Sequence, residues 1–170
     1  MRYDLSKLPE QILVDMINQD NGLNLTPEIL SFGLPAPSVV VPGRNTVVTV
    51  SAQPGTRVSG EVALHYSRLP LDSTAAGKNH IFKAEGATTI DQLIPAINAR
   101  FGINLQSSEY QNAQLPVFDG IVGHEQIPFA LSASPHSLVF TGTLVLVLNF
   151  MVVSLADLIL DTDLGDITAP

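Results

Sequence analysis

Cysteine and tryptophan do not occur in this chain of 170 residues, and aromatic residues make up only 6% of it. Without cysteine the chain can form no disulfide, no CxxC redox centre and no thiolate-bound zinc site, so packing must hold its fold together. The few aromatic rings offer little surface on which a sugar could stack. A cysteine-free chain also fits folding in a reducing cytoplasm.

Basic residues are equally scarce, and their distribution is uneven. The formal net charge is -8, and no lysine or arginine follows Arg100. All formal charges beyond this point are therefore negative, and they come from Glu109, Asp119, Glu125, Asp157, Asp161, Asp163 and Asp166. Because no basic stripe is available to neutralise phosphates, we expect no nucleic-acid partner.

The strongest candidate for a membrane span is the uncharged segment Leu138–Ala156. Its length approaches that of a spanning helix, which needs about 20 apolar residues. The segment is rich in valine and threonine, contains Asn149, and has no lysine or arginine on either flank. We therefore expect long buried strands here and no membrane partner. The N-terminus also lacks the apolar region of a secretory signal.

The sequence INQDNGLNL, which begins at Ile17, recurs at Ile97 as INARFGINL. Further along the chain, Gly60–Leu64 matches Gly142–Leu146, so the spacing between the copies grows slightly. Matching order with a drifting offset is the pattern that a duplication followed by loop insertions leaves. We therefore predict four regions, which are a first unit at 1–69, a linker at 70–88, a second unit at 89–150 and an acidic C-terminal segment at 151–170.

Each copy begins with the pattern of an amphipathic helix that ends at a glycine. In the first copy, Leu8–Ile17 supplies one apolar face and Asn21-Gly22 a left-handed stop. In the second, Thr89–Gln92 has the spacing of a capping box and Gly102 is the stop. Pro95 would lie inside this second helix, so the helix either begins later or kinks there.

Each helix is followed by a GxNL elbow, a Leu-Pro exit and two strand patterns joined by a turn. The expected strands are 45–52 and 57–68 in the first copy, and 126–133 and 138–150 in the second. Because an isolated hairpin is marginally stable in water, we expect the copies to share a core. The sequence thus predicts a strand-rich α+β fold, built from tandem helix, elbow and hairpin units packed as one pseudo-symmetric domain or as two small subdomains.

No motif of a familiar catalytic class occurs, since GxSxG, P-loop, GxGxxG and HExxH patterns are all missing. The four histidines, His65, His80, His124 and His136, are far apart in the sequence. The best acid–base pair is His124 with Glu125, but adjacent residues of a strand point to opposite faces. We therefore expect no enzymatic activity and no catalytic, cofactor-binding or metal-binding residue.

Two further patterns favour a structural interpretation. Asp161–Asp166 begins like a calcium loop, but Gly165 at the fifth position departs from that pattern, so we interpret the segment as a solvated acidic tail. Asn24 and Asn104 recur at the same point of the two copies, where an asparagine side chain can bond the backbone of its own elbow. We assign them a structural role.

The first copy combines IN-x-x-x-G-L-N-L with a Leu-Pro exit and the strand V-x-L-x-Y-x-R-L-x-L at Val62–Leu71. This combination resembles a domain of unknown function in virion structural proteins of tailed bacteriophages. The resemblance covers most of residues 8–71 and, more weakly, 89–150, where Leu148 and Phe150 replace the tyrosine and arginine. It implies a virion protein that is assembled in the host bacterial cytoplasm and has other virion proteins as partners.

Our leading hypothesis is therefore a decoration, collar or tail component of a bacteriophage, which works through protein contacts and forms a homo-oligomer. A glycan- or receptor-binding adhesion module and a small hydrolase with an unrecognised site are the alternatives. The uncharged run that starts at Leu138 exceeds what one hairpin needs. We accordingly expect a neighbouring chain to cover part of it.

Overall fold

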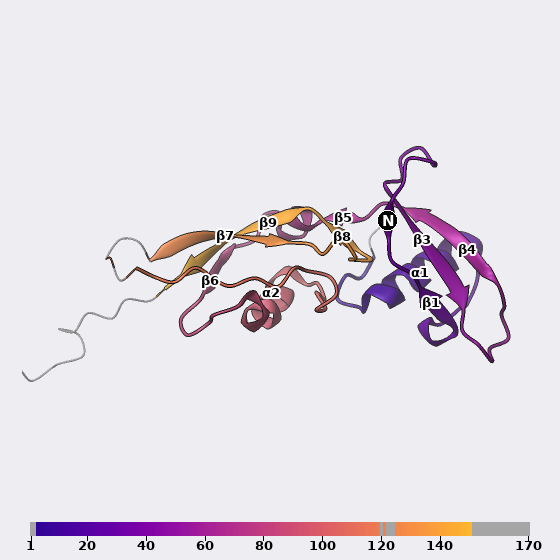
Figure 1. Ribbon diagram of the computed structural model, residues 1–170, viewed down its shortest axis with the longest axis horizontal. Helices are drawn as coiled ribbons and strands as arrows, with labels where there is room; N and C mark the ends of the chain where they lie inside the picture. The colour runs from indigo at the N-terminus through magenta and orange to yellow at the C-terminus, as the bar shows by residue number, and fades with distance from the viewer. Residues whose placement is uncertain (1–2, 120, 122–124, 151–170) are drawn as a thin grey trace, which may run out of the picture.

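A computed structural model describes residues 3–119, 121 and 125–150 of the chain. The molecule is elongated, and two helix-and-sheet units follow one another along its long axis (Figure 1). In this part of the chain, two α-helices and nine short strands form an α+β fold with three sheets. The predicted fold class is confirmed at this level.

The first unit places helix α1 beside an antiparallel sheet. Helix α1 begins with proline in its first turn and ends at Gly22, which has a φ of 66° and supplies the expected left-handed stop. Strand β3 is central, because it pairs with β4 along nearly its whole length and with β1 and β2 near its two ends. The elements are α1 (Pro9–Asn21), the 3-10 helix η1 (Pro27–Ile29), β1 (Leu30–Phe32), β2 (Ala36–Pro37), β3 (Thr46–Ala52) and β4 (Glu61–Tyr66).

The second unit also places a helix, α2, beside strands. The capping box between Thr89 and Gln92 is present, but it caps a short 3-10 helix that precedes α2. Pro95 therefore lies in the first turn of a helix that begins later, as one of the two alternatives predicted. The elements are η3 (Ile90–Gln92), α2 (Ile94–Phe101), β7 (Gln126–Ser132), β8 (Phe140–Thr141) and β9 (Thr143–Asn149).

Residues 69–84, which we call the strap, connect the two units. The sequence predicts a linker or exposed loop here, whereas the structure shows a packed segment with β5 (Leu69–Pro70), η2 (Leu71–Ala75) and β6 (Ile81–Lys83). Strand β5 pairs in parallel with β8, and β6 pairs in parallel with β9. Leu71 and Phe82 are buried, because the strap lies across the second unit.

The hairpins of the two units have the same register. Val50 lies opposite Val62 in the first unit, and Leu131 lies opposite Leu144 in the second. When Val50 is aligned with Leu131 and Val62 with Leu144, every other β3–β4 pair falls on a β7–β9 pair. This alignment also places Gly60–Leu64 on Gly142–Leu146.

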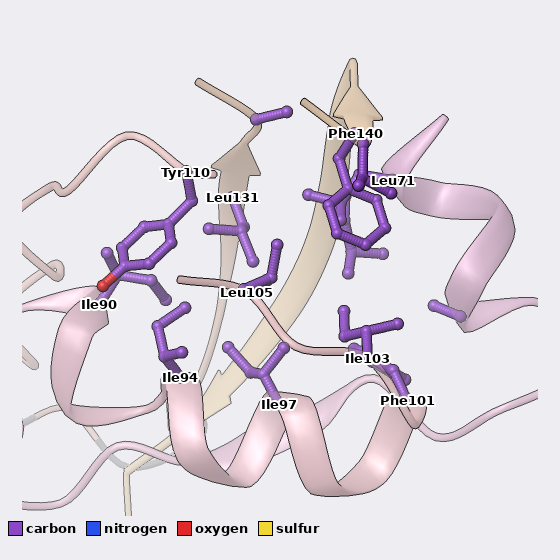
Figure 2. Close-up of a cluster of buried hydrophobic side chains, with 14 of the residues drawn as sticks. Leu71, Ile90, Ile94, Ile97, Phe101, Ile103, Leu105, Tyr110, Leu131 and Phe140 are labelled. Carbon is purple, nitrogen blue, oxygen red and sulfur yellow. The ribbon is translucent and has the colours of Figure 1, made fainter. Parts of the chain in front are cut away.

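The main core lies in the second unit, between α2 and the sheet of β6, β7 and β9. Figure 2 shows side chains from α2, from the elbow after it, from β7 and from the strap meeting in this layer. The labelled members are Leu71, Ile90, Ile94, Ile97, Phe101, Ile103, Leu105, Tyr110, Leu131 and Phe140. Ile12, Leu13, Val48 and Val50 of the first unit belong to the same cluster, so one core joins the two units.

The uncharged segment Leu138–Ala156, which was the candidate for a membrane span, contains strands β8 and β9 in its described part. Residues 140–149 contain β8, Gly142 with a φ of 78°, and β9. Residues 151–156 lie outside the described ranges. Within those ranges, the helices are all too short or too polar to reach across a bilayer.

Candidate functional site

The elbow after each helix is fixed by an asparagine one turn before the terminal glycine. The Asn18 side chain accepts from the Leu25 amide at 2.7 Å and donates to the Leu25 carbonyl at 2.8 Å. Asn98 does the same with Leu105, at 2.9 and 3.3 Å. The assignment of this role to Asn24 and Asn104 is therefore wrong, because the asparagines that bond the elbow backbone are Asn18 and Asn98 of the two IN pairs.

The apolar residues that follow the two terminal glycines differ strongly in solvent exposure. Leu23 is 50% exposed, whereas Ile103, which follows the second glycine, is only 3% exposed. The same contrast occurs in the sheets, where Val62 on β4 is 63% exposed and its β9 counterpart Leu144 is 1% exposed. The first unit therefore lacks a cover, within the described chain, that the second unit has.

These exposed residues line a groove of about 410 Å³ between α1 and the first sheet, which we call the α1–β4 groove. Its walls come from the end of α1, the elbow, β1, β3, the turn before β4, and β4 itself. The apolar lining residues are Ile17, Leu23, Leu25, Leu30, Val50, Ala52, Val58, Val62 and Leu64. A continuous apolar surface of this kind on a folded protein is typical of an interaction site.

One edge of the first sheet borders this groove and is open. Strand β9 is paired on both sides, with β7 and with β6, and its Val147 amide donates to the carbonyl of His80 at 2.9 Å. Strand β4 pairs only with β3 in the described part of the chain. His65 of β4 corresponds to Val147 in the alignment of the two hairpins. Because β4 pairs only with β3 in the described chain, its backbone at His65 is available to pair with a further strand.

The junction between the units is held by polar contacts to backbone carbonyls. The buried hydroxyl of Tyr66 donates to the carbonyl of Leu138 at 2.7 Å, and burial raises the pKa of this phenol to about 12. Arg68 donates to the carbonyls of Pro135 at 3.0 Å and Ser137 at 3.2 Å. These contacts set the position of the first unit, and hence of its groove, relative to the second.

The most buried carboxyl group of the described chain is that of Glu109, which is 1% exposed. It accepts hydrogen bonds from the Ser137 hydroxyl at 2.6 Å and from the amides of Leu138 at 2.9 Å and Val139 at 3.2 Å. Burial raises the pKa of Glu109, and these three hydrogen bonds oppose that shift. The arrangement anchors the turn before β8 through contacts that the chain makes with itself.

A second acidic group, Asp91, holds the loop after the second elbow. The hydroxyl of Tyr110 and the side-chain amide of Asn112 both donate to its carboxylate. Burial, followed by the hydrogen bond and charge of Asp91, raises the pKa of Tyr110 to about 12. This cluster again bonds the chain to itself, because both donors come from the loop that passes over η3.

The structure does not bring the described histidines together. The ring nitrogens of His80 lie 3.1 Å from the carbonyls of Val145 and Ala75, and the ring of His65 lies 3.3 Å from the Ser38 hydroxyl. Among the described residues, no three histidine or acidic side chains gather as they would around a metal ion. His124 and the segment Asp161–Asp166 lie outside the described ranges, so the predictions about them stay predictions.

The comparisons with known proteins place the chain in a family. A model of a family of unknown function, DUF7941, matches residues 2–170, and the chain belongs to this family. Neither the search of curated proteins nor the search of solved structures returned a match. The geometry of the chain itself therefore carries the argument about function.

Proposed function

We propose that this protein is a structural component of a tailed-bacteriophage virion, which acts through contacts with other virion proteins and with copies of itself. The observation that carries the proposal is the unequal cover of two equivalent faces. Val62 and Leu23 are exposed where Leu144 and Ile103 are buried. An exposed apolar groove beside an open strand edge favours assembly with another protein chain over binding of a small polar substrate.

The ionisable side chains support the same conclusion. The two clusters that could suggest chemistry, around Glu109 and around Asp91, are both occupied by donors of the chain itself. A catalytic site would need such groups in a cleft, with a position left for a reacting atom. We therefore propose a role in assembly and not in catalysis.

We also infer that the two units are tandem copies of one helix, elbow and hairpin unit, packed as a single pseudo-symmetric domain. The shared hairpin register and the matching bonds of Asn18 and Asn98 support this inference. The hairpin ends support it too, since the Ala52 and Ala133 amides donate to the carbonyls of Gly60 and Gly142 at 3.0 and 2.9 Å. An experimental structure tests it: β3–β4 should superpose on β7–β9 with α1 falling on α2.

The proposed virion role can be tested on particles of a phage that encodes this chain. Peptides of the protein should be recovered by mass spectrometry from particles purified through a density gradient, at a copy number that is constant between preparations. Antibody labelling of intact particles should then mark one location, such as the head surface, the collar or the tail. Recovery only from the unassembled fraction of the lysate would contradict the proposal.

A further inference from the structure

The strap covers one face and one strand edge of the second unit. After leaving β4, the chain pairs as β5 with β8, buries Leu71 against the second unit, and then pairs as β6 with β9. Phe82 of β6 is 2% exposed and meets the ring of Phe101 edge-on, with 5.7 Å between the ring centroids. The segment that follows the first hairpin is thus the cover of the second unit.

The first unit has a corresponding groove and strand edge, and no segment of the described chain covers them. In the alignment of β4 with β9, the α1–β4 groove and the open edge of β4 correspond to the face and the edge of β9 on which η2 and β6 lie. In the same alignment, the counterpart of β8 is Val58-Ser59, and Val58 lines the groove. A strand parallel to β4 would complete the unit.

The sequence that follows the second hairpin is suited to be that strand. The alignment that relates β4 to β9, continued without a gap, places Met151-Val152 on Leu69-Pro70 and Val153 on the buried Leu71. It also places Leu164 on Phe82. Residues 151–156 carry no charge, as a segment that enters an apolar groove requires.

The positions of the groove and of the end of β9 indicate a contact between different copies of the chain. Strand β9 runs toward one end of the long axis, and β4 lies near the other end (Figure 1). The end of β9, from which the proposed segment would continue, therefore lies at the end of the molecule opposite β4 and the groove beside it. A contact of this kind joins two unlike surfaces and repeats from copy to copy in a head-to-tail series.

We propose that residues 151–165 of one copy lie across the first unit of the next copy, as residues 69–83 lie across the second unit within the chain. Val153 fills the α1–β4 groove, and the segment pairs in parallel with the edge of β4. This proposal names the self-contact of the proposed function, and it rests on that function for its biological setting.

The test uses two full-length variants, each of which disables one side of the contact. Val62→Asp puts a charge into the groove at a side chain that is 63% exposed, so the fold itself should tolerate it. Val153→Asp puts the charge into the segment that enters the groove. Sedimentation velocity should show self-association of the wild-type chain and a monomer for each variant alone. An equimolar mixture should give a 1:1 heterodimer and no larger species, because only one intact groove and one intact segment remain.

Matched controls separate the contact from a general effect of added charge. Val39→Asp alters a valine that is 95% exposed and does not line the groove, and Ile167→Asp alters the tail beyond the proposed segment. Both controls should associate as the wild-type chain does. The proposal is overturned by a wild-type chain that stays monomeric at the highest concentration reached, by variants that still associate, or by a mixture that forms no complex.

The virion role and this self-contact can fail independently. Recovery of the chain from purified particles without self-association would support the virion role and contradict the self-contact. A chain that associates through the groove but never enters a particle keeps the contact and loses the virion role.

Discussion

The hydroxyl of Tyr66 is a residue-scale link between the two units, because it donates to the carbonyl of Leu138 at 2.7 Å in a buried position. Tyr66→Phe removes the donor and leaves that carbonyl without it, so the free energy of unfolding should fall by about 1–2 kcal/mol. Urea denaturation followed by circular dichroism measures the loss. Ser67→Ala is the control, since its hydrogen bond to the Gly43 carbonyl is exposed and its loss should cost less than about 0.5 kcal/mol. Equal losses would contradict the assigned role of Tyr66.

Glu109 predicts a pH dependence at the same scale. Its raised pKa means that the folded chain holds the proton more tightly than the unfolded chain does. Its contribution to stability is therefore complete below the ordinary value of 4.5 and is lost as the pH rises through the folded pKa. Glu109→Gln keeps the position uncharged, so its stability relative to the wild type should improve as the pH rises from below that value to neutrality. Denaturation curves at several pH values would contradict this if the difference stayed constant.

At the residue scale, the glycines that end the helices could be predicted from the sequence, whereas the side chains that fix the elbows could not. Gly22 and Gly102 could be predicted because a left-handed residue after an apolar face is a local requirement. The roles of Asn18 and Asn98 depend on how the chain folds back after the glycine, since each bonds a residue seven positions later. Recurrence of the IN pair in both copies was the available signal.

At the scale of elements, the hydrogen bonds of Asn98 in the second unit should contribute more to the free energy of unfolding than those of Asn18 in the first unit. Leu105, which Asn98 holds, is 2% exposed, whereas Leu25 on Asn18 is only partly buried. Asn98→Ala should lower the free energy of unfolding by about 2 kcal/mol, and Asn18→Ala by about 1 kcal/mol, because a buried unpaired amide costs more than one that water reaches. Chemical denaturation of both variants measures this order, and a larger loss for Asn18→Ala would contradict it.

The two central hairpins should differ in local stability. Strand β9 is paired on both edges, whereas β4 is paired on one edge among the described residues and most of its side chains are exposed or partly exposed. We expect amides of β9 to exchange with deuterium more slowly than those of β4, by at least about tenfold, because less cooperative unfolding is needed to open β4. Hydrogen exchange read by NMR on the monomeric Val153→Asp variant measures both strands. Equal protection would contradict the prediction.

Elements with a strong period could be predicted, and short elements could not. The alternating residues of β3, β7 and β9, and the first-turn proline and terminal glycine of α1, mark these elements in the sequence. Strands β1, β2, β5 and β6 have two or three residues each, too few for an alternation to appear. The strap also misleads by composition, because only isolated apolar residues such as Leu71 and Phe82 are buried among small and polar neighbours.

For the whole molecule, the candidate site could not be predicted, because it depends on which of two similar faces is covered. Leu23 and Ile103 follow equivalent glycines and have the same character in the sequence. Their exposures differ because the strap packs over the second unit in three dimensions. A repeat in the sequence identifies like positions, and only the fold of the described residues distinguishes the exposed position from the buried one.

The separation of the α1–β4 groove from the end of β9 has a consequence for any series of joined copies. At one terminus of such a series the α1–β4 groove would be uncovered, and at the other terminus residues 151–165 would have no groove to enter. The series would therefore have a direction. A protein that starts it and a protein that stops it would have to recognise different termini. Growth could accordingly be initiated from one side and limited from the other.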